Sequence, residues 1–244
     1  MKKLSSKIKF FLSRADNHTV RLIVTLASLA LFVLAAGAPD SVGGIGMNLM
    51  ILVFAVAIGL VAGLLNAKLR GKSYQLKELK HLWLVLVATL PQILAFFLPA
   101  TRERIPDQWI PFILISSQFI LLVFVWLNRK VPSIWLLGIG LLLNITVIIL
   151  NNGWMPITPE VLEAQGAPAG SWQIGSRHGY SKDIVLSKES TVLWILSDIL
   201  TLPNWIPYRV VFSIGDAILA LGVIGYLLHN NGSKQDNKSK FTGE

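Results

Sequence analysis

The sequence predicts an all-α, polytopic membrane protein with six transmembrane helices and an outer-face loop that carries a short interfacial or re-entrant helix. Three observations predict this class. Of the 244 residues, 53% are apolar and only 14% are charged, whereas soluble domains carry about 25% charged residues. Six apolar stretches have roughly the length of about 20 residues that spans a bilayer. None of these stretches contains lysine or arginine, so we expect the chain to lie in lipid.

The six predicted spans form a single membrane domain, residues 22–228, between a basic N-terminal tail (1–21) and a polar C-terminal tail (229–244). In chain order they cover residues 22–38, 47–65, 81–98, 110–127, 134–150 and 210–228. A row of small residues, Ala55, Gly59 and Gly63, would let the second span approach a neighbour closely. Pro91 would kink the third span.

Three amide side chains, Gln92, Gln118 and Asn144, lie within the third, fourth and fifth spans. Hydrogen bonds between helices are their expected use, and a functional role is the alternative. The first five spans contain no carboxylate. Ion-coupled carriers usually need titratable groups at this depth, so the sequence argues against secondary active transport.

The basic residues gather on one side of the predicted membrane. The two tails and the second and fourth connections hold sixteen basic and four acidic residues, and the rest of the chain holds six basic and nine acidic. The positive-inside rule therefore predicts that both termini are cytosolic and that this side contacts anionic lipid headgroups. No basic cluster is interleaved with aromatic residues, so nucleic acid is not an expected partner. Ala36-Gly37-Ala38 also resembles a cleavage site, which leaves a signal peptide as the alternative for the first span.

One connection is much longer than the others. Residues 151–209 form an outer-face loop of nearly 60 residues, and such loops are usually functional or disordered. Residues 188–202 are apolar with helical spacing, which predicts the short interfacial or re-entrant helix. We expect His178 to be a solvated loop residue, because it has no metal-ligand partner at helical spacing. The chain also lacks cysteine, which excludes Cys-ligated zinc and iron–sulfur sites. Neither a metal nor a cofactor is predicted.

The turn after the fifth span, Asn151-Asn152-Gly153-Trp154, has two interpretations. It can be a helix C-cap in which Gly153 is left-handed and Trp154 anchors at the membrane interface. Alternatively, it faces a substrate, and Asn152 and Trp154 are then binding residues.

Asp198 and Asp216 are the candidate catalytic residues. Asp216 is the only carboxylate in any span, and Asp198 lies in the apolar segment of the outer loop. If they meet, one keeps a proton, and the pair could activate water as in an aspartic hydrolase. The structural alternatives are a capping box of Ser213 with Asp216 and an ion pair of Asp198 with Arg209. Ser213 and Arg209 could also bind a ligand.

From about residue 45 onward, the chain resembles a bacterial membrane protein family known as domain of unknown function 5317. The residues that carry this resemblance are Asn152-Gly153-Trp154-Met155-Pro156, Ser190-Thr191, Leu196-Ser197-Asp198, Val211-Phe212-Ser213-Ile214-Gly215-Asp216 and Gly222. The resemblance implies a small bacterial membrane protein and supplies no activity.

Residues 198–228 are also similar to the C-terminal part of lipoprotein signal peptidase, an aspartic intramembrane enzyme. There an Asp ends one apolar segment and a Phe-Asn-x-Ala-Asp sequence opens the last helix. The corresponding sequence here is Phe212-Ser213-Ile214-Gly215-Asp216. This resemblance implies that Asp198 and Asp216 are the catalytic pair. The Asn and Asp-Arg signature of that family has no counterpart, and the span count is six against four.

We therefore expect a binding, assembly or accessory component of a bacterial cytoplasmic membrane, for which the sequence names no protein partner. An aspartic intramembrane hydrolase acting near the outer leaflet through Asp198 and Asp216 is the alternative. A small-molecule permease is the third possibility.

Overall fold

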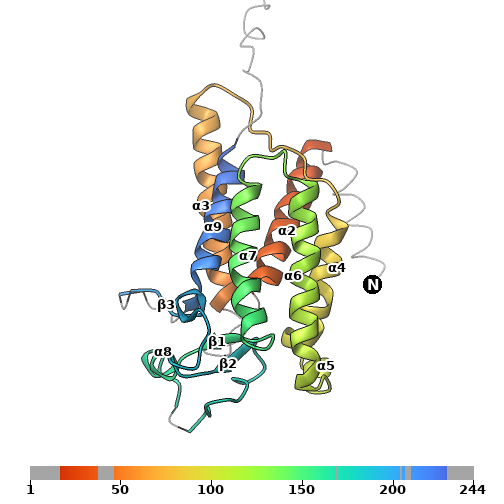
Figure 1. The fold of residues 1–244 in the computed structure, drawn as a ribbon. Coiled ribbons are helices and arrows are strands. Elements are labelled where there is room, and N and C mark those ends of the chain that lie inside the picture. The colour runs from red at the N-terminus through yellow and green to blue at the C-terminus, as the bar shows by residue number, and fades with distance from the viewer. Residues whose placement is uncertain (1–16, 38–46, 169, 204, 207–209, 230–244) are drawn as a thin grey trace, which may run out of the picture.

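The computed structural model describes residues 17–37, 47–168, 170–203, 205–206 and 210–229, and the chain is mostly helical (Figure 1). Most of both predicted tails and Arg209 lie outside these residues. The helices are α2 (Asn17–Gly37), α3 (Met47–Leu69), α4 (Trp83–Gln92), α5 (Pro99–Arg102), α6 (Ile110–Leu127), α7 (Ile134–Leu150), α8 (Pro159–Ala164) and α9 (Ile214–Leu228). Short turns of other helix types are the π-helical η1 (Ile93–Phe97) and the 3₁₀-helical η2 (Asp107–Trp109) and η3 (Trp194–Leu196). The strands are β1 (Met155–Ile157), β2 (Asp183–Val185), β3 (Leu200–Thr201) and β4 (Val211–Phe212).

The long helices α2, α3, α4, α6, α7 and α9 run lengthwise beside one another as a bundle (Figure 1). Residues 151–213 cover one end, and we call this segment the cap. It contains α8 and two small sheets, in which β1 pairs with β2 in parallel and β3 with β4 in antiparallel orientation. The connections 70–82 and 128–133 lie at the opposite end, which we call the loop end.

Small residues let the helices around α9 approach closely. A Cβ atom added to Gly63 of α3 would lie 2.3 Å from the carbonyl oxygen of Leu227 in α9. One added to Gly140 of α7 would lie 2.6 Å from the carbonyl oxygen of Gly215. The predicted small-residue row on the second apolar helix is thus confirmed as a packing face, and its neighbour is α9.

Amide side chains join α2 to its neighbours. Gln92 of α4 donates through Nε2 to the carbonyl oxygen of Ala35 (2.8 Å), and Gln118 of α6 donates to that of Ala36 (2.9 Å). These carbonyl groups lie in the last turn of α2, where no later helical N–H is available to them. Both glutamines therefore act as interhelical hydrogen-bonding groups. The predicted disturbance at Pro91 takes the form of the π-helical turn η1, which follows α4 directly.

Two helical segments in the described residues are long and apolar enough to cross a membrane, judged by length and composition. They are Thr19–Ala36 and Asp107–Leu127. Four shorter apolar helices accompany them, Phe54–Leu69, Trp83–Phe97, Ile134–Leu150 and Ile214–Leu228. The helical fold class is confirmed, and the count of six spans stays a prediction.

The predicted helix at residues 188–202 is wrong. The segment forms only the single turn η3 and then continues into β3. Leu193 has a positive φ of 55°, which interrupts a right-handed helix. The side chain of Asn151 also bonds both the N–H (3.0 Å) and the carbonyl oxygen (2.9 Å) of Val192, which supplies partners outside any helix.

Candidate functional site

β1 positions two charged side chains at the centre of the cap. On one edge it pairs with β2, and the N–H of Met155 donates to the carbonyl oxygen of Lys182 (3.1 Å). On its other edge Asp198 forms a bridge to Ile157, and the N–H of Asp198 donates to the carbonyl oxygen of Pro156 (3.1 Å). Lys182 and Asp198 therefore flank the same short strand although they lie 16 positions apart in sequence.

The side chains of Lys182, Asp183 and Asp198 form a buried ionic cluster. The Lys182 ammonium donates to Oδ2 of Asp198 and, at 3.0 Å, to Oδ1 of Asp183. Oδ1 of Asp198 and Oδ2 of Asp183 are buried and have no hydrogen-bond partner among the described residues. The cluster thus holds two carboxyl groups for one ammonium group.

Burial decides the protonation of Asp198, whose exposed fraction is 0%. Desolvation raises the pKa of this carboxyl group to about 8, although the Lys182 charge opposes the shift. The negative charges of Asp183 and Asp216 act in the same direction as burial. At neutral pH the proton therefore resides largely on Asp198, which brings the cluster close to electrical neutrality.

Asp216 belongs to a second network at the start of α9. The Ser213 hydroxyl accepts from the N–H of Asp216, and the Asp216 carboxylate accepts from the N–H of Ser213, both at 3.0 Å. The predicted capping box is thus confirmed. Asn144 of α7 joins both residues: its Nδ2 donates to Asp216 (2.8 Å) and its Oδ1 accepts from the Ser213 hydroxyl (2.9 Å).

The structure brings the two candidate catalytic aspartates to the same end of the bundle and gives them different partners. Asp198 precedes β3 by two residues, and β3 pairs with β4, which leads directly into the Ser213 cap. No hydrogen bond between the two carboxyl groups is found in the described part of the chain. Their link is electrostatic, since the charge of Asp216 raises the pKa of Asp198.

The turn after α7 is a helix C-cap. Gly153 is left-handed as predicted (φ 86°), and Asn152 shares this conformation (φ 58°). The N–H of Gly153 donates to the carbonyl oxygen of Ile148 (2.8 Å), as expected where a helix ends on a left-handed residue. The side chain of Asn152 is exposed, and the half-buried Trp154 packs against a cluster of η1 and α6 that includes Phe96 and Ile110. The geometry supports the capping interpretation for Asn152.

Arg177 fastens the cap to the α5–α6 corner. Its guanidinium group bonds Asp107 (2.6 Å) and the carbonyl oxygen of Ser181 (2.7 Å). It also lies 5.6 Å from the ring centroid of Trp154 and 5.7 Å from that of Phe96, distances at which a cation and a ring attract.

The expectation of a solvated His178 is wrong. The residue is buried, and its backbone N–H donates to the carbonyl oxygen of Asp183 (2.9 Å). The Ser181 hydroxyl donates to the His178 carbonyl oxygen (2.7 Å), which closes a tight turn before β2. Burial lowers the pKa of the imidazole, against the opposing charge of Asp183.

Sequence reasoning missed Lys182 and Asp183. Their signal was a charged pair at the start of a short apolar run, residues 184–186, and Asp183 is itself the first residue of β2. The proposed partner of Asp198, Arg209, lies outside the described residues, and Lys182 is the partner that the structure gives. Among the described residues no group of three acidic or histidine side chains is placed to hold a metal ion.

Fold and site define a mostly helical protein in which a small, ionically fastened cap covers one end of an apolar bundle. Residues 76–228 match the family of unknown function DUF5317. The match covers more than half of the chain, and the chain belongs to this family. The matched region begins at residue 76, later than the position near 45 that the sequence motifs indicate. These findings do not show the similarity to lipoprotein signal peptidase.

Comparison with curated proteins and with solved structures gives no match. The family supplies no activity, so the function has to be argued from the geometry.

Proposed function

We propose that the chain is an integral protein of a bacterial cytoplasmic membrane with six spans, cytosolic termini and an outer-face cap, and that it serves as a binding, assembly or accessory component. The observation that carries this proposal is the apolar outer surface of the bundle. Large apolar side chains are exposed on all six long helices. Examples are Ile23, Val24, Phe54, Ile58, Val61, Leu65, Trp83, Leu86, Val87, Leu90, Phe112, Phe119, Val123, Trp135, Leu142, Ile149 and Leu221.

Most polar side chains in the middle of the same helices face inward, and the exposed Thr146 of α7 bonds the carbonyl oxygen of Leu142 in its own helix. Thr89, Gln92, Ser117, Gln118 and Asn144 are all buried. A helix on a water-soluble protein has the opposite pattern, with its polar face outward, and soluble monomers rarely expose apolar patches of this extent. A bundle with apolar groups outside and polar groups inside suits a hydrocarbon surrounding.

The two ends of the bundle differ in charge. Among the described residues, the loop end carries eight basic residues and a single acidic one, Glu78, while acidic residues outnumber basic ones at the cap end. The basic residues of the loop end are Arg21, Lys68, Arg70, Lys72, Lys77, Lys80, Arg129 and Lys130. The positive-inside rule then supports a cytosolic loop end and an external cap.

The two alternatives have less support. An aspartic hydrolase needs a carboxyl group that substrate and water can reach, and Asp198 is fully buried and bonded to Lys182. A permease needs polar groups that its cargo can reach, whereas Gln92 and Gln118 are buried and each bonds a carbonyl group of α2 through Nε2. Only their buried Oε1 atoms have no partner among the described residues. The fastened cap is the part best suited to meet a partner at the outer surface.

Cysteine labelling tests the topology. The chain contains no cysteine, so a thiol reagent can react with the protein only at the single introduced cysteine. Glu163→Cys lies in the cap and Lys68→Cys near the loop end, and both positions are exposed. In intact cells an impermeant maleimide should label the first variant and should label the second only after permeabilisation. The reverse pattern, or a protein recovered in the soluble fraction, would contradict the proposal.

A further inference from the structure

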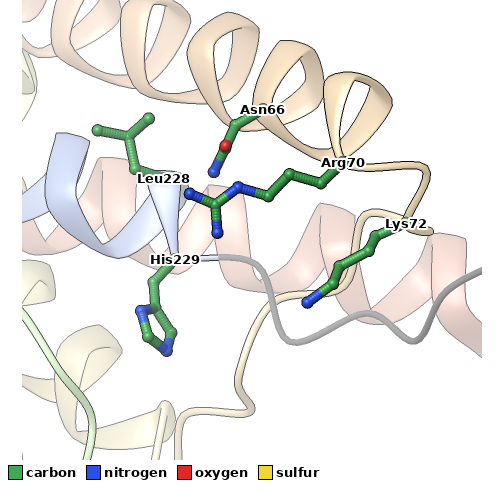
Figure 2. Close-up of a pocket in the computed structure, with 5 residues that line it drawn as sticks. All are labelled: Asn66, Arg70, Lys72, Leu228 and His229. Carbon is green, nitrogen blue, oxygen red and sulfur yellow. The ribbon is translucent and has the colours of Figure 1, made fainter.

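A basic pocket lies at the loop end, between the C-terminal turns of α3 and the end of α9. It is lined by Asn66, Arg70, Lys72, Leu228 and His229 and has a volume of about 230 Å³. Figure 2 shows the Arg70 guanidinium and the Lys72 ammonium extending to the same side, toward the end of α9 where Leu228 and His229 lie. Two cationic side chains, an imidazole and an amide thus line the pocket together with the apolar Leu228.

The backbone holds the walls of this pocket in place. Gly71 is left-handed (φ 60°) and ends α3, and the N–H of Lys72 donates to the carbonyl oxygen of Ala67 (2.9 Å). This turn lets Arg70 and Lys72, which lie on either side of Gly71, reach the same space. The Tyr74 hydroxyl donates to the carbonyl oxygen of Leu227 (2.8 Å), which ties the segment to the end of α9.

Among the residues that the structure describes, no carboxylate lines the pocket. Glu78, the one acidic residue of the loop end in the described chain, pairs with Arg21. Neither Arg70 nor Lys72 has an ion-pair partner within the described ranges. The two side chains therefore form a local positive field that attracts an anion.

The donors and the surroundings define the anion. A guanidinium group with an ammonium group beside it suits the oxygens of a phosphate. The pocket is smaller than the volumes of about 300–1,000 Å³ that enclose drug-sized ligands, so it suits a headgroup and leaves a larger molecule outside. Leu65 and Leu69 of α3 are exposed beside Arg70, and Leu69 is 86% exposed. An acyl chain would cover this apolar surface.

We propose that this pocket binds the phosphate group of an anionic phospholipid of the cytosolic leaflet, an inference that rests on the membrane embedding proposed above. Basic pockets between membrane helices on the cytosolic side recognise such headgroups. Asn66 and Arg70 bond the phosphate oxygens, Lys72 adds charge, and the lipid chains run along the exposed leucines of α3.

The test uses the full chain purified in a neutral detergent and a fluorescent phosphatidylglycerol, whose anisotropy reports binding. The variant Arg70→Gln/Lys72→Gln should weaken binding by at least about tenfold. The control Lys68→Gln/Lys80→Gln removes the same charge from the same end without touching the pocket lining, and it should retain affinity within about threefold. Equal losses in the two variants would overturn the proposal, because they would indicate general surface charge.

Three further measurements separate a phospholipid site from charge attraction alone and from a free-phosphate site. Asn66→Leu removes a lining amide without changing the net charge, and it should weaken binding several-fold; unchanged affinity would count against the site. Unlabelled phosphatidylcholine and excess inorganic phosphate should not displace the probe. Displacement by inorganic phosphate would overturn the lipid assignment in favour of a free-phosphate site. Binding in detergent does not depend on orientation, so failure here and failure of the labelling test are distinguishable.

Discussion

Lys182 is the residue on which the cap depends most. Its ammonium group is buried and bonds two buried carboxyl groups. Removing a buried partner leaves uncompensated charge and costs about 3–5 kcal/mol. Removing the Asp198 carboxyl group should cost less stability, because Lys182 keeps Asp183 as its partner.

We therefore expect Lys182→Met to lower the free energy of unfolding by about 3–5 kcal/mol and Asp198→Asn to lower it by no more than about 1 kcal/mol. Both values would come from denaturant or thermal unfolding of the purified protein, followed by circular dichroism. Equal losses in the two variants would show that Asp198 is ionised and indispensable to the cluster.

The protonation of Asp198 makes stability depend on pH. Its pKa in the folded chain is raised to about 8 from an ordinary value of 3.8, with burial as the main cause. The folded state then binds a proton that the unfolded state releases, so this contribution is fully present below about pH 4 and declines as pH rises through 8. The unfolding temperature of the parent should fall between pH 6 and pH 9 relative to that of Asp198→Asn. Parallel curves for the two proteins would exclude Asp198 as the titrating group.

At the residue scale, the sequence predicted features that are local. The Ser213–Asp216 capping box and the left-handed Gly153 depend on residues within five positions of each other, and both are present. The pairing of Lys182 with Asp198 depends on β1 lying between β2 and Asp198. That pairing joins segments far apart in the chain, and no local pattern reports it.

At the scale of elements, α9 is held to α7 by a close approach at its first turn. A Cβ atom added to Gly215 would lie 1.9 Å from Oδ1 of Asn144, the atom that accepts from the Ser213 hydroxyl. Gly215→Ala should therefore displace Asn144 and lower the free energy of unfolding by about 1–3 kcal/mol.

A double-mutant cycle separates this clash from a general intolerance of the helix. Asn144→Ala removes the obstructing amide, so Gly215→Ala should cost clearly less in that background than in the parent. The readout is the free energy of unfolding of the four proteins. Additive losses would mean that the Asn144 amide does not limit position 215, and the carbonyl oxygen of Gly140, 2.8 Å from the added Cβ atom, would remain as the obstacle.

The positions of helices were predictable from the sequence where a continuous apolar segment was long enough to span a membrane. The predicted fourth and fifth apolar segments coincide with α6 and α7 at both ends, and the last segment begins only four residues before α9. Residues 188–202 have helical spacing too, and they are not helical because Asn151 and the left-handed Leu193 impose another backbone path. Periodicity predicts a helix only where tertiary contacts do not supply the backbone with other partners.

For the whole molecule, the distribution of apolar and polar groups carries more information than the total composition. The buried side chains include apolar groups from every long helix, such as Phe32, Ala55, Ala88, Phe124, Leu137 and Tyr226. The outer faces are apolar as well, so burial alone does not distinguish inside from outside. The distinction comes from the buried amides and hydroxyls, such as those of Gln92, Gln118 and Asn144.

A charged substitution on the outer face distinguishes a lipid surrounding from water. Leu90 lies at the middle of the continuous helical stretch from Trp83 to Phe97, and it is 59% exposed. In water, arginine at an exposed position changes stability by only about 0.5 kcal/mol. At the centre of a membrane-spanning helix, the same residue costs about 2.5–3.5 kcal/mol on insertion. We therefore expect Leu90→Arg to reduce the fraction of the chain that resists carbonate extraction from membranes.

Leu69→Arg is the matched control, because that exposed leucine ends α3 beside Arg70, where a long cationic side chain reaches the headgroup region. The control should integrate as the parent does, and equal integration of all three proteins would argue that the outer face meets water.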